Sequence, residues 1–174
     1  LILHLSRLIE AKKFNSNDLC NYGYWQCFNK DWKQSDFFNF GKFLDQNLKE
    51  IPHNQLVEIS EVSNSKIRIG FLSSDILSGH SITYFLKTIL SNYEKSKFEI
   101  ILVLSNSKED KLTNSFKNLV DKTINISQLN NVNAINQVRE LNLDILVDLM
   151  GYTSTHRIEL FKSCLLYTSP SPRD

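Results

Sequence analysis

From residue 67 onward, the sequence alternates nearly continuous apolar runs with segments whose apolar residues recur at helical spacing. The runs at 98–104 (FEIILVL) and 143–149 (LDILVDL) are typical of parallel strands that are covered on both faces of a sheet. The clearest helical face is formed by Ile82, Phe85, Leu86, Ile89 and Leu90. The order β-α-β-α-β-α-β-α predicts an α/β fold with an open, mostly parallel, Rossmann-like sheet and right-handed crossovers.

The other elements of this α/β region follow the same alternation. Strands are predicted at 67–73 and 123–126, and helices at 112–120, 132–141 and 156–161. We therefore assign residues 66–163 to one Rossmann-like domain.

The first fifty residues carry a purely helical pattern. Apolar residues recur at helical spacing over 1–9, and a polar break follows in which Asn17 or Asp18 could cap a second, aromatic helix. A third helix is predicted at 36–49. We expect residues 1–50 to be a short α-helical leader or the end of a helical-repeat region, with most of their aromatic side chains in a core.

Two further segments flank the predicted domain. Residues 51–65 are polar, contain Pro52 and are predicted to be a linker. Residues 164–174 (CLLYTSPSPRD) match, in one reading frame, the translation of a common transposase sequencing adapter. We expect them to be a non-native tail, with a different native continuation after Ser163, and we exclude them from the fold. Because no methionine starts the chain, we also expect it to begin in mid-protein.

Charge and hydropathy exclude several classes of function. The 20 basic and 19 acidic residues give a net charge of +1, whereas a nucleic-acid-binding surface needs a basic stripe. No apolar run approaches the ~20 residues of a membrane span. Cys20, Cys27 and Cys164 have the spacing of neither a disulfide framework nor a zinc site. Free thiols in a cytoplasmic protein are therefore expected.

Ligands of open parallel sheets bind beyond the carboxyl ends of the strands, where the first predicted strand leads into a polar loop. His80 should stand at or just before the N-terminus of the next helix, whose partial positive charge disfavours the imidazolium form. A neutral imidazole there could accept a proton, and Asp75 could order the loop or orient His80. Ser73, Ser74 and Gly79 are candidate substrate-binding residues, and an ordinary exposed loop is the alternative interpretation.

The second such loop follows the apolar strand that ends near residue 149. Gly151 suits a tight turn, and Tyr152 and Thr153 follow it as candidate substrate-binding residues. One of the hydroxyl residues at 153–155 could cap the next helix. Arg157 is unfavourable in the first turn of a helix, which indicates a specific partner such as a carboxylate or a phosphate. A solvated surface arginine is the alternative.

Other chemical motifs are missing from the sequence. Asp144 and Asp148 would lie ~13 Å apart on a strand, too far for paired acid–base work. Neither a dinucleotide-binding fingerprint nor a phosphate loop occurs, and no Cys/His cluster has zinc spacing.

Several segments together resemble the catalytic region of the O-linked N-acetylglucosaminyltransferase family, including its Spindly-like members. Residues 66–75 (KIRIGFLSSD) resemble the family strand R-I-G-Y-V-S-x-D, and residues 79–86 (GHSITYFL) resemble the Spindly-like turn N-H-S-V-x-Y-F-L. Residues 143–153 (LDILVDLMGYT) resemble I-D-I-L-V-D-L-x-G-[HY]-T, and residues 157–161 (RIELF) resemble the R-x-x-x-F that follows. The blocks occur in the family's order and at matching separations, so together they are more specific than any one of them.

The resemblance implies two Rossmann-like lobes that face each other across a cleft, with this chain as the first lobe. Family members transfer a sugar from a nucleotide-sugar to serine or threonine hydroxyls of proteins, with inversion and without a required metal. UDP-N-acetylglucosamine would be the donor and a protein or peptide the acceptor, with no further cofactor. His80 matches the family's active-site histidine. Because the missing second lobe holds most of the nucleotide, the chain alone is expected to be inactive.

Three departures from the family pattern leave alternatives open. Ser81 stands where many members have proline, and residues 1–65 show no clear tetratricopeptide signature. The proline-rich segment expected after Phe161 is replaced by the tail. The alternatives are a non-catalytic protein- or sugar-binding module derived from this lobe, and a related transferase that uses another sugar donor or modifies asparagine.

Overall fold

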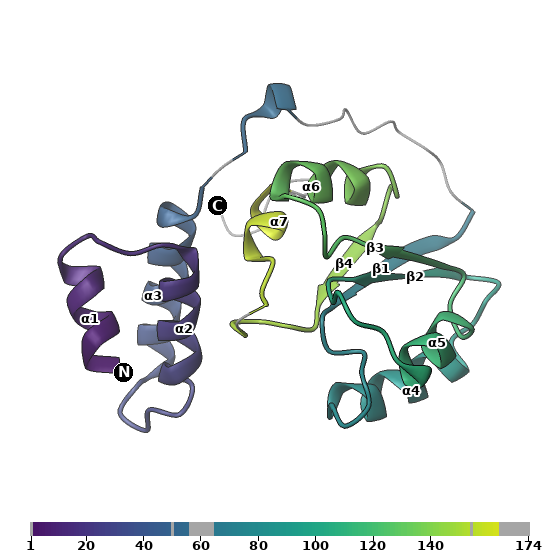
Figure 1. Cartoon of the computed structure of the whole chain (residues 1–174), viewed down its shortest axis with the longest axis horizontal. Helices are drawn as coiled ribbons and strands as arrows, with labels where there is room; N and C mark the ends of the chain where they lie inside the picture. Colours follow the sequence, from purple (N-terminus) through teal and green to yellow (C-terminus); the bar gives the residue numbers. More distant parts are fainter. Residues whose placement is uncertain (1, 50, 56–64, 154, 164–174) are drawn as a thin grey trace.

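A computed structural model describes residues 2–49, 51–55, 65–153 and 155–163 (Figure 1). The expected non-native tail lies outside the described residues, as does most of the expected linker. The division into leader, linker and domain therefore stays a prediction. In the described part of the chain, no helix is long and apolar enough to cross a membrane.

Four parallel strands form one sheet in the order β3-β2-β1-β4. They are β1 (Ile67–Ser73), β2 (Phe98–Leu104), β3 (Lys122–Asn125) and β4 (Ile145–Asp148). The predicted open, parallel, Rossmann-like sheet is confirmed, and the two longest strands have the predicted bounds. The last strand is shorter than its apolar run at 143–149, although the amides of Asp144 and Leu149 still donate to carbonyls of β1.

Helices cover both faces of the sheet, as the apolar strands require. On one face lie α4 (Ile82–Asn92) and α5 (Lys111–Lys117), and on the other α6 (Asn131–Arg139) and α7 (Ile158–Ser163) (Figure 1). Successive strand residues point to opposite faces. Phe71 accordingly packs in the α4/α5 core, and Leu72 packs in the α6/α7 core.

The expected apolar face of α4 is only partly buried. Leu86 and Leu90 lie in the core, but Phe85 is 70% exposed and Ile89 is 51% exposed. The helix turns by about 100° per residue, so orienting Leu86 and Leu90 toward the sheet carries the preceding residues outward. The predicted helix is therefore confirmed, but Phe85 and Ile89 on its apolar face stay exposed.

The leader contains α1 (Ile2–Glu10), α2 (Ser16–Gln26) and α3 (Gln34–Asn47), as the helical pattern predicted. The cap of α2 is Asn15, rather than Asn17 or Asp18. The Asn15 side chain accepts from the Asp18 amide at 3.1 Å, and the Asp18 carboxylate accepts from the Asn15 amide at 2.9 Å. This reciprocal pair is a capping box, in which the acidic residue stands three positions after the cap.

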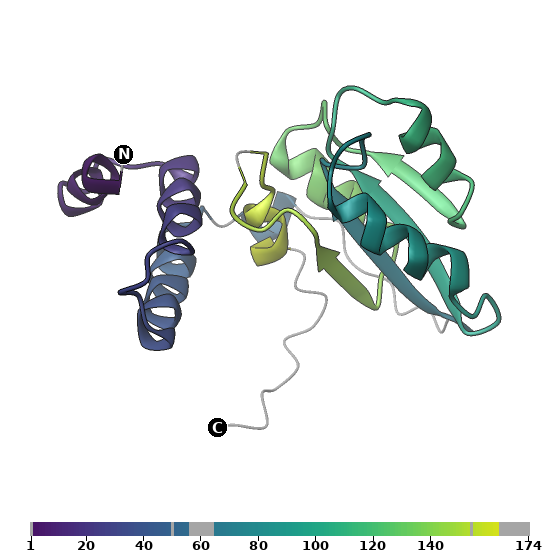
Figure 2. The ribbon, with the colours of Figure 1, turned by 90° about the horizontal axis from the view of Figure 1, so that it is seen from below.

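The leader packs against the segment that joins β4 to α7 (Figure 2). Tyr152 and Ile158 enter a cluster whose buried members, Leu19, Phe40, Leu44 and Leu48, come from the leader. The Lys162 ammonium lies 3.5 Å from the Asp45 carboxylate at the same junction. Aromatic and aliphatic burial therefore joins the leader to the lobe, and the ion pair is half open to solvent.

Two glycines in leader helices provide a matched test of this packing. A Cβ at Gly23 would lie 2.6 Å from the Phe40 ring and 3.2 Å from the Tyr152 ring, whereas one at Gly41 meets nothing within 4 Å. Gly41→Ala should stabilise the protein by about 0.5–1 kcal/mol, because alanine favours the helix. Gly23→Ala should lose about 1 kcal/mol net, because overpacking outweighs that gain. Urea unfolding measures both changes, and equal stabilisation by the two variants would contradict the described packing.

Candidate functional site

The two loops with chemically useful side chains lie at neighbouring strand ends. The first (residues 74–81) follows β1 and the second (residues 149–157) follows β4, and β1 pairs directly with β4. From β1 the chain crosses to β2 and β3 on one side and then returns to β4 on the other. The β1/β4 boundary is therefore the topological switch point, where open α/β sheets bind ligands.

A chain of hydrogen bonds joins the two loops. Ser74 Oγ donates to Asp75 Oδ1 at 2.9 Å and lies 2.6 Å from Thr155 Oγ1. A hydroxyl has one proton, so Ser74 must accept from Thr155 while it donates to Asp75. The amide of Asp75 in turn donates to Ser73 Oγ at 3.0 Å. Ser73 and Ser74 are buried, so these contacts hold the carboxylate of Asp75 at the strand end.

His80 lies at the open end of this chain. It directly precedes Ser81, the N-cap residue of α4, as the sequence predicted. Its Nδ1 lies 3.8 Å from Asp75 Oδ1, which is beyond hydrogen-bond range, and half of its side chain is exposed. Gly79 just before it has φ +89°, a left-handed conformation that favours glycine. The turn thus presents an accessible imidazole near a carboxylate.

The sequence analysis missed Asp110, which holds the first loop from α5. Its carboxylate accepts from the Ser78 amide at 2.8 Å and from the Thr113 amide at 2.9 Å. Hydrogen bonds lower the pKa of Asp110 below its usual range, and the bond with Ser78 contributes most. Thr113 Oγ1 also donates to the Ile76 carbonyl at 2.6 Å. The D-x-x-T spacing just before a helix was the available signal, since it is a variant of the capping box.

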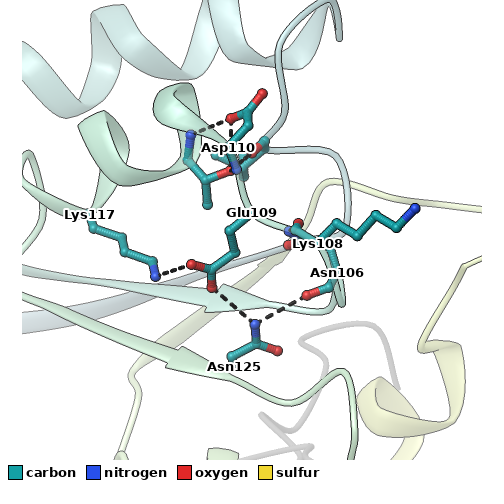
Figure 3. Close-up of polar contacts among 8 residues, drawn as sticks. Asn106, Lys108, Glu109, Asp110, Lys117 and Asn125 are labelled. Carbon is teal, nitrogen blue, oxygen red and sulfur yellow. Dashed lines mark hydrogen bonds and ion pairs between the residues drawn. The ribbon is translucent and has the colours of Figure 1, made fainter.

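Neighbouring polar residues continue this support at the ends of β2 and β3 (Figure 3). Glu109 pairs with Lys117 and accepts from Asn125 Nδ2, which also donates to the Asn106 carbonyl. Together with Asp110, these contacts fix the β2–α5 connection against which the His80 loop rests.

The second loop turns where the sequence predicted. Gly151 has φ +56°, and the Asp148 carboxylate accepts from the amides of Met150 at 2.9 Å and Gly151 at 3.2 Å. Thr153 Oγ1 is buried and has no hydrogen-bond partner among the described residues. A buried hydroxyl without a partner is costly. The predicted contact of Thr153 with substrate stays a prediction.

The expected helix cap in this loop is wrong. The helix begins at Ile158, too late for residues 153–155 to cap it. Thr155 instead bonds Ser74, and Ser154 lies outside the described residues.

Tyr152 lies where the leader meets the lobe, and its candidate role in substrate binding stays a prediction. Its ring packs edge-on against Phe40, with ring centroids 6.0 Å apart, inside the core of the leader. Burial raises the pKa of its phenol, with smaller contributions from Cys20 and Cys27. Within the described structure, Tyr152 joins the leader to the lobe.

Arg157 has specific partners, and those among the described residues are neutral oxygens. A carboxylate or phosphate partner stays a prediction. Nε donates to Ser105 Oγ at 3.2 Å, and Nη1 donates to Asn131 Oδ1 at 3.0 Å. Nη2 donates to the backbone carbonyls of Ile126, Ser127 and Leu129 at 3.1, 3.4 and 3.2 Å. Arg157 therefore ties the start of α7 to the β3–α6 connection, on the α6/α7 face of the sheet.

His156 is a buried titratable group that the sequence analysis did not single out. Its side chain is 3% exposed, Nε2 lies 2.9 Å from Asn17 Oδ1, and Nδ1 lies 4.0 Å from Glu159 Oε2. Burial lowers the pKa of His156 from its ordinary value of 6.5. The carboxylates of Glu159 and Asp148 oppose this shift without cancelling it, and Arg157 adds to it. The imidazole is therefore neutral near pH 7.

Comparisons with known proteins agree on one family. Residues 45–167 match the model described as glycosyl transferase family 41. Two relatives are probable UDP-N-acetylglucosamine–peptide N-acetylglucosaminyltransferases named SPINDLY. The Solanum lycopersicum protein is 26% identical over 115 residues, which are 64% of this chain and 12% of that protein. The Arabidopsis thaliana protein is 29% identical over 96 residues, which are 53% of this chain and 10% of that protein. The chain thus spans about a tenth of these relatives' length.

A solved structure has the same fold. A mutant of the Thermobaculum terrenum O-GlcNAc transferase superposes with a TM-score of 0.77 at 18% identity. The match covers 92% of this chain and 31% of that one.

The support of the first loop by Asp110 can be tested by hydrogen exchange. Asp110→Ala removes the acceptor of the Ser78 amide and the N-terminal acceptor of α5, so both amides should exchange faster. We expect protection of Ser78 and Thr113 to fall by about tenfold, while the amides of β1 keep theirs. Lys108→Ala, two residues away, is the matched control. Unchanged protection at Ser78 in Asp110→Ala would contradict the role given to Asp110.

Burial of neutral His156 predicts a pH dependence of stability. The folded-state pKa lies below the unfolded value of 6.5, so the unfolded chain binds the proton more readily. The free energy of unfolding should therefore keep its highest value above pH 6.5 and should fall as the pH is lowered below 6.5. Glu99 and Glu109, whose pKa values are lowered from 4.5, titrate below this window. Urea unfolding at about pH 7.5 and about pH 5.5 should show a smaller loss in His156→Gln than in the unaltered chain. Equal losses would contradict the buried neutral state.

Proposed function

The chain belongs to glycosyl transferase family 41, and from this premise we propose that the protein carrying it transfers N-acetylglucosamine from UDP-N-acetylglucosamine to serine or threonine hydroxyls of proteins. The reaction proceeds with inversion at the sugar and needs neither a metal nor a further cofactor. The names of the plant relatives support the donor and the peptide acceptor.

One structural observation carries the proposal to particular residues. The Thr155–Ser74–Asp75 hydrogen-bond chain ends 3.8 Å from His80, at the switch point of a parallel sheet. Those contacts hold a carboxylate beside an exposed imidazole at the ends of β1 and β4. A sugar transferase needs groups at such an edge that bind the acceptor hydroxyl and the sugar.

The residues have distinct roles in this scheme. His80 contacts the reacting hydroxyl and accepts its proton as the oxygen attacks the anomeric carbon. Asp75, held by Ser73 and Ser74, keeps the imidazole oriented. Thr153 donates or accepts a hydrogen bond at the sugar. A second lobe supplies the contacts that stabilise the departing diphosphate, so much of the rate comes from positioning and electrostatics outside this chain.

We place this reaction in the cytoplasm, where unpaired thiols persist. Among the described residues, Cys20 is free and buried and Cys27 is free and exposed. Desolvation raises the pKa of Cys20 to about 12, so its thiol stays protonated and unreactive.

The test uses the longer protein whose gene contains this stretch. Incubated with UDP-N-acetylglucosamine and a serine-containing peptide, it should add one N-acetylhexosamine per modified hydroxyl, and excess EDTA should not inhibit it. His80→Ala should lower kcat/KM by about 10²–10⁴-fold, in line with the loss of a general base. Lys87→Ala on the exposed side of α4 is the control. The 174-residue chain alone should give no product.

Mass spectrometry of the peptide separates the alternatives. A different mass increment would indicate another sugar donor, and label on asparagine would indicate another acceptor. Binding of the peptide without any transfer would favour the non-catalytic module. The reason for considering that alternative is Ser81, which stands where many family members have proline. Full activity of a folded His80→Ala variant would refute the role given to His80.

A further inference from the structure

Large apolar side chains are exposed on the α/β lobe. Among its described residues, these side chains are Ile67, Tyr84, Phe85, Ile89 and Ile145. Single exposed apolar residues are normal on a protein surface, whereas a contiguous group of them marks a contact surface. Their places on the strands and on α4 show that all but Tyr84 belong to one group.

The strands β1 and β4 contribute to this group on the side of the sheet that carries α4 and α5. Phe71 and Val147 are paired across the two strands and pack in or against the α4/α5 core, and the pair next to them is Ile69 with Ile145. Residues two apart on a strand share a face, so Ile145 also points to this side. It is 47% exposed, whereas Ile100 of β2 in the same core is 2% exposed. Figure 2 looks onto this side, and no described helix lies in front of β4.

Helix α4 contributes the remaining members of the group. Leu86 and Leu90 point to the core, and Tyr84 lies on the flank toward α5, where it lines a pocket with two residues of that helix. Because a helix turns by about 100° per residue, Phe85 and Ile89 lie on the other flank, away from α5. The strand order β3-β2-β1-β4 places α5 on the β3 side of α4, so this other flank is directed toward β4.

The strand and helix members together form one surface, which we call the uncovered face. Its residues are Ile67, Ile69, Phe85, Ile89, Ile145 and Val147. All six side chains are hydrocarbons, so a partner gains by burying apolar area there rather than by charge. Helices cover both faces of parallel sheets. A helix beside α4, at the usual interaxial distance of ~8–10 Å, would contact the strand and helix members together.

The length of the relatives indicates where such a helix comes from. The matches span 12% and 10% of the two plant proteins and 31% of the chain in the Thermobaculum terrenum structure. Most of each of those polypeptides therefore lies outside the part that this chain matches. A tethered segment reaches an effective concentration on the order of millimolar at a neighbouring surface, without any recruitment of a separate protein.

We propose that the uncovered face binds an amphipathic helix of the same polypeptide, supplied by the longer protein from outside residues 1–174. The apolar side of this helix packs on Ile145 of the sheet and on Phe85 of α4, and it completes the layer that α4 and α5 begin. The contact goes beyond the sugar-transfer proposal, because it involves neither His80 nor a sugar donor.

The test measures the alkylation by iodoacetamide of Phe85→Cys, Ile145→Cys and Tyr84→Cys variants, with peptide mass spectrometry at each position. In the 174-residue chain all three positions should react readily, because the three side chains are exposed. In the longer protein, positions 85 and 145 should react about tenfold more slowly, because only local opening exposes them. Tyr84→Cys, on the other flank of α4, is the matched control and should keep its rate.

Two further measurements identify the element that covers the face. Protection of position 85 in the longer protein should persist on dilution by about a hundredfold, because a tethered helix is not lost by dilution. When photoreactive p-benzoylphenylalanine replaces Phe85 in the longer protein, it should crosslink to a segment outside residues 1–174 whose apolar residues recur at helical spacing.

Three results would overturn the proposal. Equal alkylation rates at positions 84 and 85 in the longer protein would mean that its own polypeptide leaves the face open. Protection that is lost on dilution, together with a dimer in sedimentation, would assign the face to a second copy. A crosslink within residues 1–163 would assign it to this chain. Sugar transfer enters none of these measurements, so a failure of the proposed transferase activity would leave their outcome unchanged.

Discussion

The pairing of β1 with strands on both of its edges is the constraint on which the rest of the structure depends. β1 is hydrogen-bonded to β2 on one side and to β4 on the other, so its two faces must be covered by helices and its ends must carry the loops. Gly70 permits the close approach of the neighbouring segment, because a Cβ there would lie 2.5 Å from the Leu143 side chain. The same pairing brings the loops after β1 and β4 together, and Ser74 and Thr155 can meet only for that reason.

The second loop serves both architecture and chemistry. Tyr152 packs into the leader and Arg157 ties α7 to the β3–α6 connection, while Thr153 between them retains a buried hydroxyl without a described partner. Flanking residues that are held by packing restrict the backbone of Thr153, and a ligand-binding group benefits from such rigidity. Tyr152 and Arg157 thus have structural contacts on either side of Thr153, and the substrate-binding roles predicted for all three stay predictions.

The two histidines near the carboxyl ends of the strands, His80 and His156, differ in their exposure to solvent. The His80 turn is open, carries an exposed imidazole and depends on Asp110 from a neighbouring helix. The His156 side chain is buried where the leader meets the lobe, and its imidazole is neutral. Burial explains the state of His156, because a desolvated imidazole resists protonation.

Local patterns in the sequence determined the α/β alternation, the bounds of β1 and β2, the turn at Gly151 and the place of His80 before α4, since each depends on neighbouring residues. The family resemblance, carried by ordered blocks, was equally readable there. Contacts between distant segments could not be read from the sequence. The exposure of Phe85 follows from how α4 sits on the sheet, and the partners of Arg157 and Tyr152 lie dozens of residues away in sequence. Only the tertiary structure could bring Asp110 to Ser78 and Asn17 to His156, because hydrogen bonds and burial depend on distances that periodicity does not encode.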